Sequence, residues 1–258
     1  MSDGEVRYVR EGNIARVVFD RPAARNAMTW RMYEQLAEAC ARIAREDGLR
    51  AAVFRGTGGK AFIAGTDIAQ FQAFRGGDDG LAYEKKMGAY LDTIEALPVP
   101  TLAVIEGFAI GGGLAIAACC DLRIATPGSR FGVPIARTLG NCLSMENYAR
   151  LVAGFGASRA KRMLLLAENL SAEEALTSGF LSEIVPESEL DRRVAELTER
   201  HAHHAPITMR VSKEAIRRLL HAGLPPGDDL ARACYASEDF RIGIKAFVDK
   251  REPQWTGR

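Results

Sequence analysis

Two glycine-containing turns, each placed between a short apolar run and the start of a helix, constrain the fold of this chain most strongly. They occupy residues 61–68 and 107–114. The same order of strand, turn, helix and strand repeats through the first two thirds of the chain, with short connections. This repetition predicts an α/β fold in which helices pack on sheets.

The last third of the chain has a different pattern. From about Ser144 onward, apolar residues recur mostly at helical spacing. The tail has little apolar core of its own, which suits a helical lobe that packs on a neighbour. We therefore expect a core over residues 1–197 and a C-terminal helical lobe over residues 198–258.

Composition excludes several classes of partner. The 258 residues carry a net charge of +1, and 47% of them are hydrophobic. That is enough for a full core but gives no field that attracts nucleic acid or a membrane surface. No signal-peptide or membrane-spanning run is visible, and the five cysteines form no CxxC pair. The sequence predicts a cytoplasmic protein with no nucleic-acid and no membrane partner.

The two turns also carry a chemical prediction. A glycine run at a helix N-terminus leaves backbone N–H groups without intrahelical partners, and the helix dipole adds positive potential there. If both turns converge, two N–H donors hold one oxygen as it becomes negative, which is the geometry of an oxyanion hole. Each turn alone fits tight packing of a helix on a strand equally well.

Five motifs, in this order along the chain, resemble those of one family. They are RPAARNAMT, AFIAGTDI, EGFAIGGGLAIAACCDLRIA, AEEALTSGFLSEIVP and KAFVDKREPQWTGR, which start at residues 21, 61, 106, 172 and 245. Their combination resembles the crotonase (enoyl-CoA hydratase/isomerase) superfamily. The resemblance implies a crotonase-like spiral of short β-β-α units with a C-terminal helical trimerisation lobe. It also implies a homotrimer, or a hexamer made of two trimers.

The resemblance implies an active site as well. The backbone N–H groups of Thr66 and Gly112 are expected to form the oxyanion hole around the thioester oxygen of an acyl-CoA substrate. Coenzyme A enters as part of that substrate, so no permanently bound cofactor is expected.

Four further residues are implied at the coenzyme A moiety. Ala64 is expected to line the adenine site, and Arg25 to lie near the nucleotide end. Lys250 and Arg251 are expected to contact the phosphates, and in an oligomer this contact can come from a neighbouring chain.

Both glutamates of the hydratase pattern are replaced. One follows the GGG run by two residues, where this chain has Ala115, and the other follows the proline of F-G-x-P-E, where it has Ile135. Adding water to an enoyl thioester needs a base for the water and an acid for the α-carbon, and neither side chain transfers protons. Glu146 is the nearest carboxylate in the segment that follows and is our candidate acid/base. As a first-turn residue of a helix capped by Ser144, it equally suits a structural role.

Other polar residues near these motifs have two interpretations each. Arg137 binds a substrate carboxylate or forms an ion pair, and Asn141 donates to a substrate carbonyl or serves a turn. Cys142 suits the nucleophile of a thioester hydrolase, although no histidine is adjacent to it. Asp67 caps a helix start or acts in catalysis. Three histidines suit a helix end better than a metal site, so no metal is predicted: His201, His203 and His204.

The sequence therefore predicts an enzyme of the enoyl-CoA hydratase/isomerase family, a lyase or isomerase of fatty acid metabolism, that stabilises a thioester enolate. An alternative is another reaction on the same fold, either acyl-CoA decarboxylation or thioester hydrolysis. Decarboxylation makes the enolate without a protein base and so tolerates the loss of both glutamates. A third possibility is a non-catalytic homologue that binds acyl-CoA.

Overall fold

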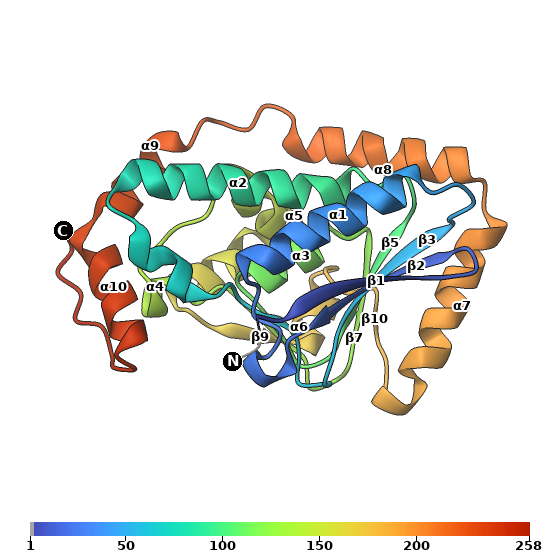
Figure 1. Cartoon of the computed structure of the whole chain (residues 1–258), viewed down its shortest axis with the longest axis horizontal. Coiled ribbons are helices and arrows are strands. Elements are labelled where there is room, and N and C mark those ends of the chain that lie inside the picture. The colour runs from blue at the N-terminus through green and yellow to red at the C-terminus, as the bar shows by residue number, and fades with distance from the viewer. Residues whose placement is uncertain (1–2) are drawn as a thin grey trace.

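Two sheets form the centre of the molecule (Figure 1). The computed structural model describes the backbone of residues 3–258 and the side chains of all of these except residues 69 and 70. The larger sheet has the order β1 (Glu5–Glu11), β2 (Ile14–Asp20), β3 (Ala51–Gly56), β5 (Thr101–Ile105), β7 (Leu122–Ala125) and β10 (Glu183–Ile184). The smaller sheet has the order β4 (Ala61–Ala64), β6 (Phe108–Ile110), β8 (Arg130–Gly132) and β9 (Asn169–Ser171).

The chain alternates between the two sheets. After β3 it adds β4 to the smaller sheet, and it does the same with β5 and β6 and with β7 and β8. Successive strands within each sheet pair in parallel, while β1 with β2 and β8 with β9 pair antiparallel. This alternation is the predicted spiral of short β-β-α units, and the predicted α/β class is confirmed.

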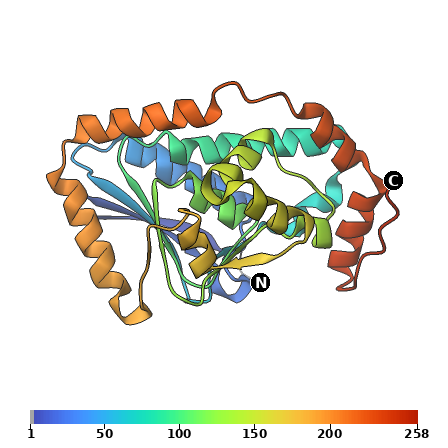
Figure 2. The same ribbon diagram turned by 180° about the vertical axis from the view of Figure 1, so that it is seen from behind.

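Helices surround the sheets (Figures 1 and 2). Their bounds are α1 (Trp30–Arg45), α2 (Gly77–Glu95), α3 (Gly112–Cys119), α4 (Ile135–Thr138), α5 (Met145–Leu165), α6 (Ala172–Thr177), α7 (Leu190–His203), α8 (Pro206–His221), α9 (Asp228–Ala236) and α10 (Glu238–Val248). Three short 3-10 helices join them, η1 (Pro22–Ala24), η2 (Ile68–Ala73) and η3 (Glu187–Glu189). Thr29 is the N-cap of α1, and its hydroxyl accepts a hydrogen bond from the N–H of Met32.

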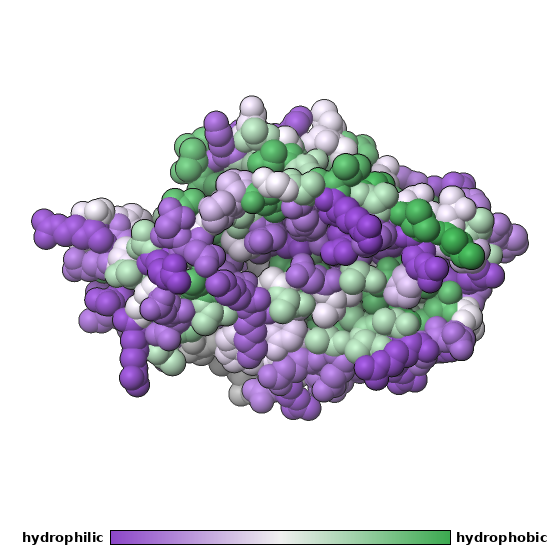
Figure 3. All heavy atoms as spheres, turned by 90° about the horizontal axis from the view of Figure 1, so that it is seen from above, coloured by the Kyte–Doolittle hydropathy of each residue, from purple (hydrophilic) through white to green (hydrophobic). Residues whose placement is uncertain are grey.

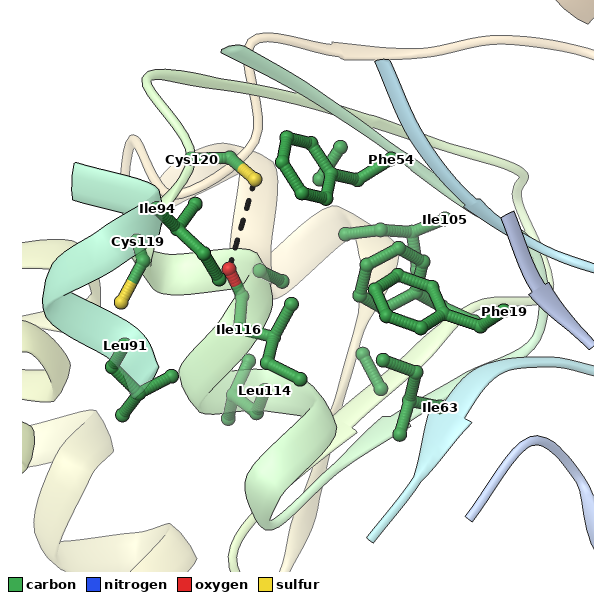
Figure 4. Close-up of a cluster of buried hydrophobic side chains, with 14 of the residues drawn as sticks. Phe19, Phe54, Ile63, Leu91, Ile94, Ile105, Leu114, Ile116, Cys119 and Cys120 are labelled. Carbon is green, nitrogen blue, oxygen red and sulfur yellow. Dashed lines mark hydrogen bonds between the residues drawn. The ribbon is translucent and has the colours of Figure 1, made fainter. Parts of the chain in front are cut away.

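Alternation along the strands divides the core into two clusters. In β3, Phe54 points toward α1 and α3, and Val53 points to the other face, where Val194 of α7 packs. Figure 4 shows the first cluster, in which Leu114 and Ile116 of α3 lie among side chains from α2 and the strands. Because α3 is buried among strands and helices, its sequence is apolar all round.

The predicted C-terminal lobe folds back on its own chain. Helix α9 packs along α2, and α10 contacts η2. Tyr235 of α9 and Phe240 of α10 form a small buried cluster with Phe71 and Leu139. A domain division at residue 197 falls inside α7, and it stays a prediction, as does the role of this region in trimerisation.

One side of the molecule exposes apolar residues. Helix α8 lies along the upper side in Figure 1, and Figure 3 shows hydrophobic side chains among charged ones on that side. The exposed apolar residues of α8 are Ile207, Val211, Ile216 and Leu219. Among the helices within residues 3–258, none combines the length and the apolar character that a membrane span requires.

Candidate active site

The two glycine turns meet at one edge of the smaller sheet. Strands β4 and β6 pair in parallel with Ala64 opposite Ile110, so Gly65 and Gly111 leave the sheet side by side. Both glycines have positive φ values, +95° and +55°, which residues with a side chain rarely adopt. A Cβ atom built on Gly111 lies 3.8 Å from the Cα of Gly65. The convergence expected from the sequence is therefore present in the fold.

Each turn presents a backbone N–H at this point. A parallel bridge between Met28 and Thr66 uses the carbonyl of Gly65 and the N–H of Asp67, which leaves the Thr66 N–H outside the pairing. Gly112 is the first residue of α3. The N–H groups in the first turn of a helix have no intrahelical carbonyl to donate to. Both N–H groups belong to residues that line the same cavity.

That cavity has a volume of about 490 Å³ and is walled mainly by apolar side chains. Its walls come from α1, α2, the two turns, the start of α3, α4 and the loop that precedes α5. Apolar contributors include Phe71, Met87, Leu91, Val133 and Leu143. A mostly apolar concave site with a few polar groups is the usual form of a small-molecule site.

A hydroxyl pair lies beside the two N–H groups. The Tyr33 hydroxyl and the Thr66 Oγ1 are 2.8 Å apart. A Cβ atom built on Gly112 lies 2.6 Å from the Tyr33 hydroxyl and 2.8 Å from Thr66 Oγ1, so only glycine fits there without displacing them. Burial raises the pKa of Tyr33 to about 12, so its hydroxyl stays protonated at neutral pH.

The two residues that replace the glutamates of the family pattern both line the cavity. Ala115 lies in the first turn and a half of α3, and Ile135 begins α4. Neither side chain can take or give a proton. A proton donor or acceptor in this cavity therefore has to be another of the residues that line it.

A carboxylate that the sequence analysis missed stands in the wall of the cavity. Glu84 of α2 lines the cavity and is only 5% exposed. It lies on the same face of α2 as Leu81, Met87 and Leu91, all of which are buried. An acidic residue on the apolar stripe of an amphipathic helix was the signal that could have found it.

The predicted acid/base lies elsewhere. Glu146 is exposed in the first turn of α5, behind the Ser144 cap, and is not among the residues that line the cavity. Asn141 does line it, and its Oδ1 is buried without a hydrogen-bond partner among the described residues. Cys142 lies outside the lining, and hydrogen bonding with the Cys234 thiol, together with burial, raises its pKa, which disfavours a thiolate nucleophile.

Two of the four residues expected at coenzyme A line the cavity directly. Ala64 and Arg25 do so, and the Arg25 guanidinium lies 5.4 Å from the centroid of the Phe108 ring. Arg251 lines a neighbouring pocket of about 440 Å³ together with Arg137. Lys250 is exposed and lines neither pocket.

Asp67, the polar candidate in the first turn, has a structural partner. The Asp67 carboxylate accepts a hydrogen bond of 2.9 Å from Arg21, which ties the first turn to the segment before η1. Within the described part of the chain, no group of three His, Cys, Asp or Glu side chains is placed to hold a metal ion.

Comparison with known proteins defines the class of this fold. The structure of a methylmalonyl-CoA decarboxylase in complex with 2-nitronate-propionyl-CoA has a TM-score of 0.90 at 28% identity, with 98% of both chains covered. An enoyl-CoA hydratase/carnithine racemase from Magnetospirillum magneticum has a TM-score of 0.79 at 33% identity, covering 98% of this chain and 96% of the other. The chain thus has the crotonase fold.

Sequence relatives narrow the assignment. The chain is 30% identical to a short-chain-enoyl-CoA hydratase of Clostridium acetobutylicum, with 94% of each chain covered. It is also 30% identical to the 2,3-dehydroadipyl-CoA hydratase of Escherichia coli, covering 98% of this chain and 99% of that protein. The enoyl-CoA hydratase/isomerase family model matches residues 9–258, and the chain belongs to this family.

Proposed function

We propose that this chain is an acyl-CoA enzyme in which the backbone N–H groups of Thr66 and Gly112 stabilise a thioester enolate. The observation that carries the proposal is the meeting of the two glycine turns at the wall of one largely apolar cavity. Family membership supports a CoA thioester as the substrate and an enzymatic role.

The physical basis is charge stabilisation in a site shielded from water. When a proton or a carboxylate leaves the α-carbon of a thioester, negative charge moves on to the carbonyl oxygen. Two fixed N–H donors and the positive potential at the N-terminus of α3 stabilise that charge without any rearrangement of the protein. One such donor contributes about 3–4 kcal/mol to a transition state of this kind.

We propose the same arrangement of coenzyme A as the family resemblance implies. Ala64 and Arg25 would meet the nucleotide part at the cavity mouth, and Lys250 and Arg251 would meet phosphates. Coenzyme A comes and goes with the acyl group, so the enzyme would need no resident cofactor. The working form would be a homotrimer or a hexamer.

The first test is an ultraviolet assay of the purified protein with crotonyl-CoA, which follows loss of the conjugated thioester. Rapid loss, with 3-hydroxybutyryl-CoA found by mass spectrometry, would establish hydration. No loss in the presence of intact CoA-thioester binding would exclude a hydratase of short enoyl groups and leave the other enolate-forming reactions.

A second candidate reaction is decarboxylation of a malonyl-type thioester. Two observations favour it, the apolar residues Ala115 and Ile135 in the cavity and the TM-score of 0.90 to a methylmalonyl-CoA decarboxylase. Loss of CO2 leaves the electron pair on the α-carbon, so no base is needed to form the enolate. Release of CO2 from malonyl-CoA or methylmalonyl-CoA would support this reaction, and thioesters recovered unchanged would exclude it.

A further inference from the structure

We propose that Glu84 is the proton-transfer residue of this cavity and that Tyr235, from the C-terminal segment, positions it. The inference rests on the proposed function, because it names the group that moves a proton to or from the carbon next to the thioester. The sequence motifs place proton transfer on α3, α4 or α5, whereas Glu84 lies on α2.

Hydrogen bonds fix both oxygens of the Glu84 carboxylate. The Tyr235 hydroxyl donates to Oε1 over 2.5 Å, and the backbone N–H of Ser144 donates to Oε2 over 3.0 Å. Each carboxylate oxygen has two lone pairs, so each keeps one free for a proton. The three residues are far apart in sequence, and Tyr235 reaches Glu84 because α9 packs along α2.

A second glutamate on the same helix shows what a structural carboxylate looks like here. Glu95 is bound by Arg150 through two hydrogen bonds of 2.9 Å and by His221. Those partners outweigh the effect of burial and lower the pKa of Glu95. Glu84 has no ion pair among the described residues, so its charge is not fixed by a cation.

Glu84 is therefore poised to change its protonation state near neutral pH. Burial raises its pKa to about 7, although the hydrogen bonds from Tyr235 and Ser144 act in the opposite direction. A pKa close to the working pH suits general acid–base catalysis. The titratable groups on its own helix and on the elements around it that interact electrostatically with Glu84 are Tyr33, Tyr83, Cys142, Glu146, Tyr148, Cys234 and Tyr235.

The proton balance is simple. The Glu84 carboxylate takes a proton from the α-carbon of the acyl group, and the C–H electron pair becomes the enolate whose oxygen lies in the hole. The carboxyl then returns the proton to the α-carbon, or to the γ-carbon when a double bond is conjugated with the enolate. If the enolate arises by loss of CO2, the carboxyl supplies the proton that replaces it and regains one from solvent. No oxidant or reductant is required.

The test uses 3-butenoyl-CoA in deuterium oxide, because its α-protons are activated by the thioester and by the double bond. Mass spectrometry measures deuterium incorporation and absorbance measures conversion to crotonyl-CoA. We expect the wild-type protein to exchange the proton and Glu84→Gln to lose about 100-fold or more in rate while still binding the thioester. An exposed glutamate on α1 provides the matched control, Glu38→Gln, which should keep the full rate.

The outcomes separate the two proposals. No exchange by the wild-type protein, together with no turnover of crotonyl-CoA or malonyl-type thioesters, would refute the proposed function itself. Exchange that survives in Glu84→Gln would refute only the role of Glu84. If Glu146→Gln lost the rate instead, the exposed carboxylate of α5 would hold that role.

A second variant tests the positioning residue. Tyr235→Phe removes a donor that stabilises the ionised carboxylate, so the pKa of Glu84 should rise. Because the ionised form is the base, the rising limb of the pH–rate profile should move to higher pH by roughly one unit. A lower rate with the limb unmoved would show that Tyr235 has only a structural role and would overturn this part of the proposal.

Discussion

At the scale of single residues, the proposed oxyanion hole depends on a few glycine positions where a side chain does not fit. Gly65 and Gly111 have left-handed φ values, and Gly112 leaves no room for a Cβ atom beside the two hydroxyls. These demands explain why glycine recurs in both turns. They also explain why the turns could be recognised in the sequence, since glycine residues followed by an apolar helix form a local pattern.

Replacement of Gly112 tests the hole at this scale. Gly112→Pro removes the N–H donor and should lower kcat about 10²- to 10³-fold, while thioester binding is retained in part. Steady-state kinetics and a binding titration measure the two effects. Gly128→Ala is the matched control, because a Cβ atom there meets nothing within 4 Å. Unchanged turnover in Gly112→Pro would rule out the proposed hole.

For Glu84, the sequence predicts only part of the environment of the side chain. Its burial could be inferred from the helix register, but its partners could not. Ser144 and Tyr235 lie 60 and 151 residues further along the chain, and no local pattern reports such contacts. Glu146 was more prominent in the sequence because it is the nearest carboxylate after the F-G-x-P motif, yet it is exposed to solvent in the fold.

At the scale of elements, a cluster of ion pairs joins α5 to α2, a helix that lines the cavity. Arg150 of α5 is 1% exposed and joins Glu95 and Asp92 of α2. Replacing Arg150 by alanine leaves the Glu95 carboxylate buried without its main partner. We expect a loss of about 3–5 kcal/mol in the free energy of unfolding, measured by urea denaturation.

The ion pair between Arg150 and Glu95 predicts that the stability of the protein depends on pH. The pKa of Glu95 is lower in the folded protein than the ordinary glutamate value, so its contribution is fully present above that ordinary value. The contribution is lost as the pH falls through the lowered pKa. Thermal melting temperature should therefore decline on acidification below about pH 4.5, and Arg150→Ala should show a shallower decline. Parallel curves for the two proteins would contradict this assignment.

The layering of helices on sheets could be predicted from the sequence, but strands β6, β8 and β9 of the smaller sheet could not, because each has only three residues. The alternation of short apolar runs with turns predicts the α/β class, whereas the spiral is what the family resemblance implies. The capping hydrogen bonds of Thr29 and Ser171 each reach only three residues along the chain, so they belong to local patterns. The return of α9 and α10 on to α2 and η2 could not be predicted. Both helices are amphipathic, and an amphipathic pattern does not say which surface the apolar face will cover.

At the scale of the whole molecule, the exposed apolar residues of α8 indicate a contact between chains. Leu219 is 77% exposed and Ile207 is 67% exposed on one helix. We expect a trimer or a hexamer in solution by analytical ultracentrifugation. Leu219→Asp should shift the distribution toward smaller species, and a wild-type protein that sediments as a monomer would contradict the expectation.

We propose that the backbone N–H groups of Thr66 and Gly112 polarise the thioester carbonyl. Difference infrared spectroscopy with crotonyl-CoA carrying 13C at the carbonyl measures this polarisation directly. We predict a lower carbonyl stretching frequency in the complex than in free solution, and a frequency near the free value in the Gly112→Pro complex. A carbonyl frequency that does not change when the thioester binds to the wild-type protein would contradict the account.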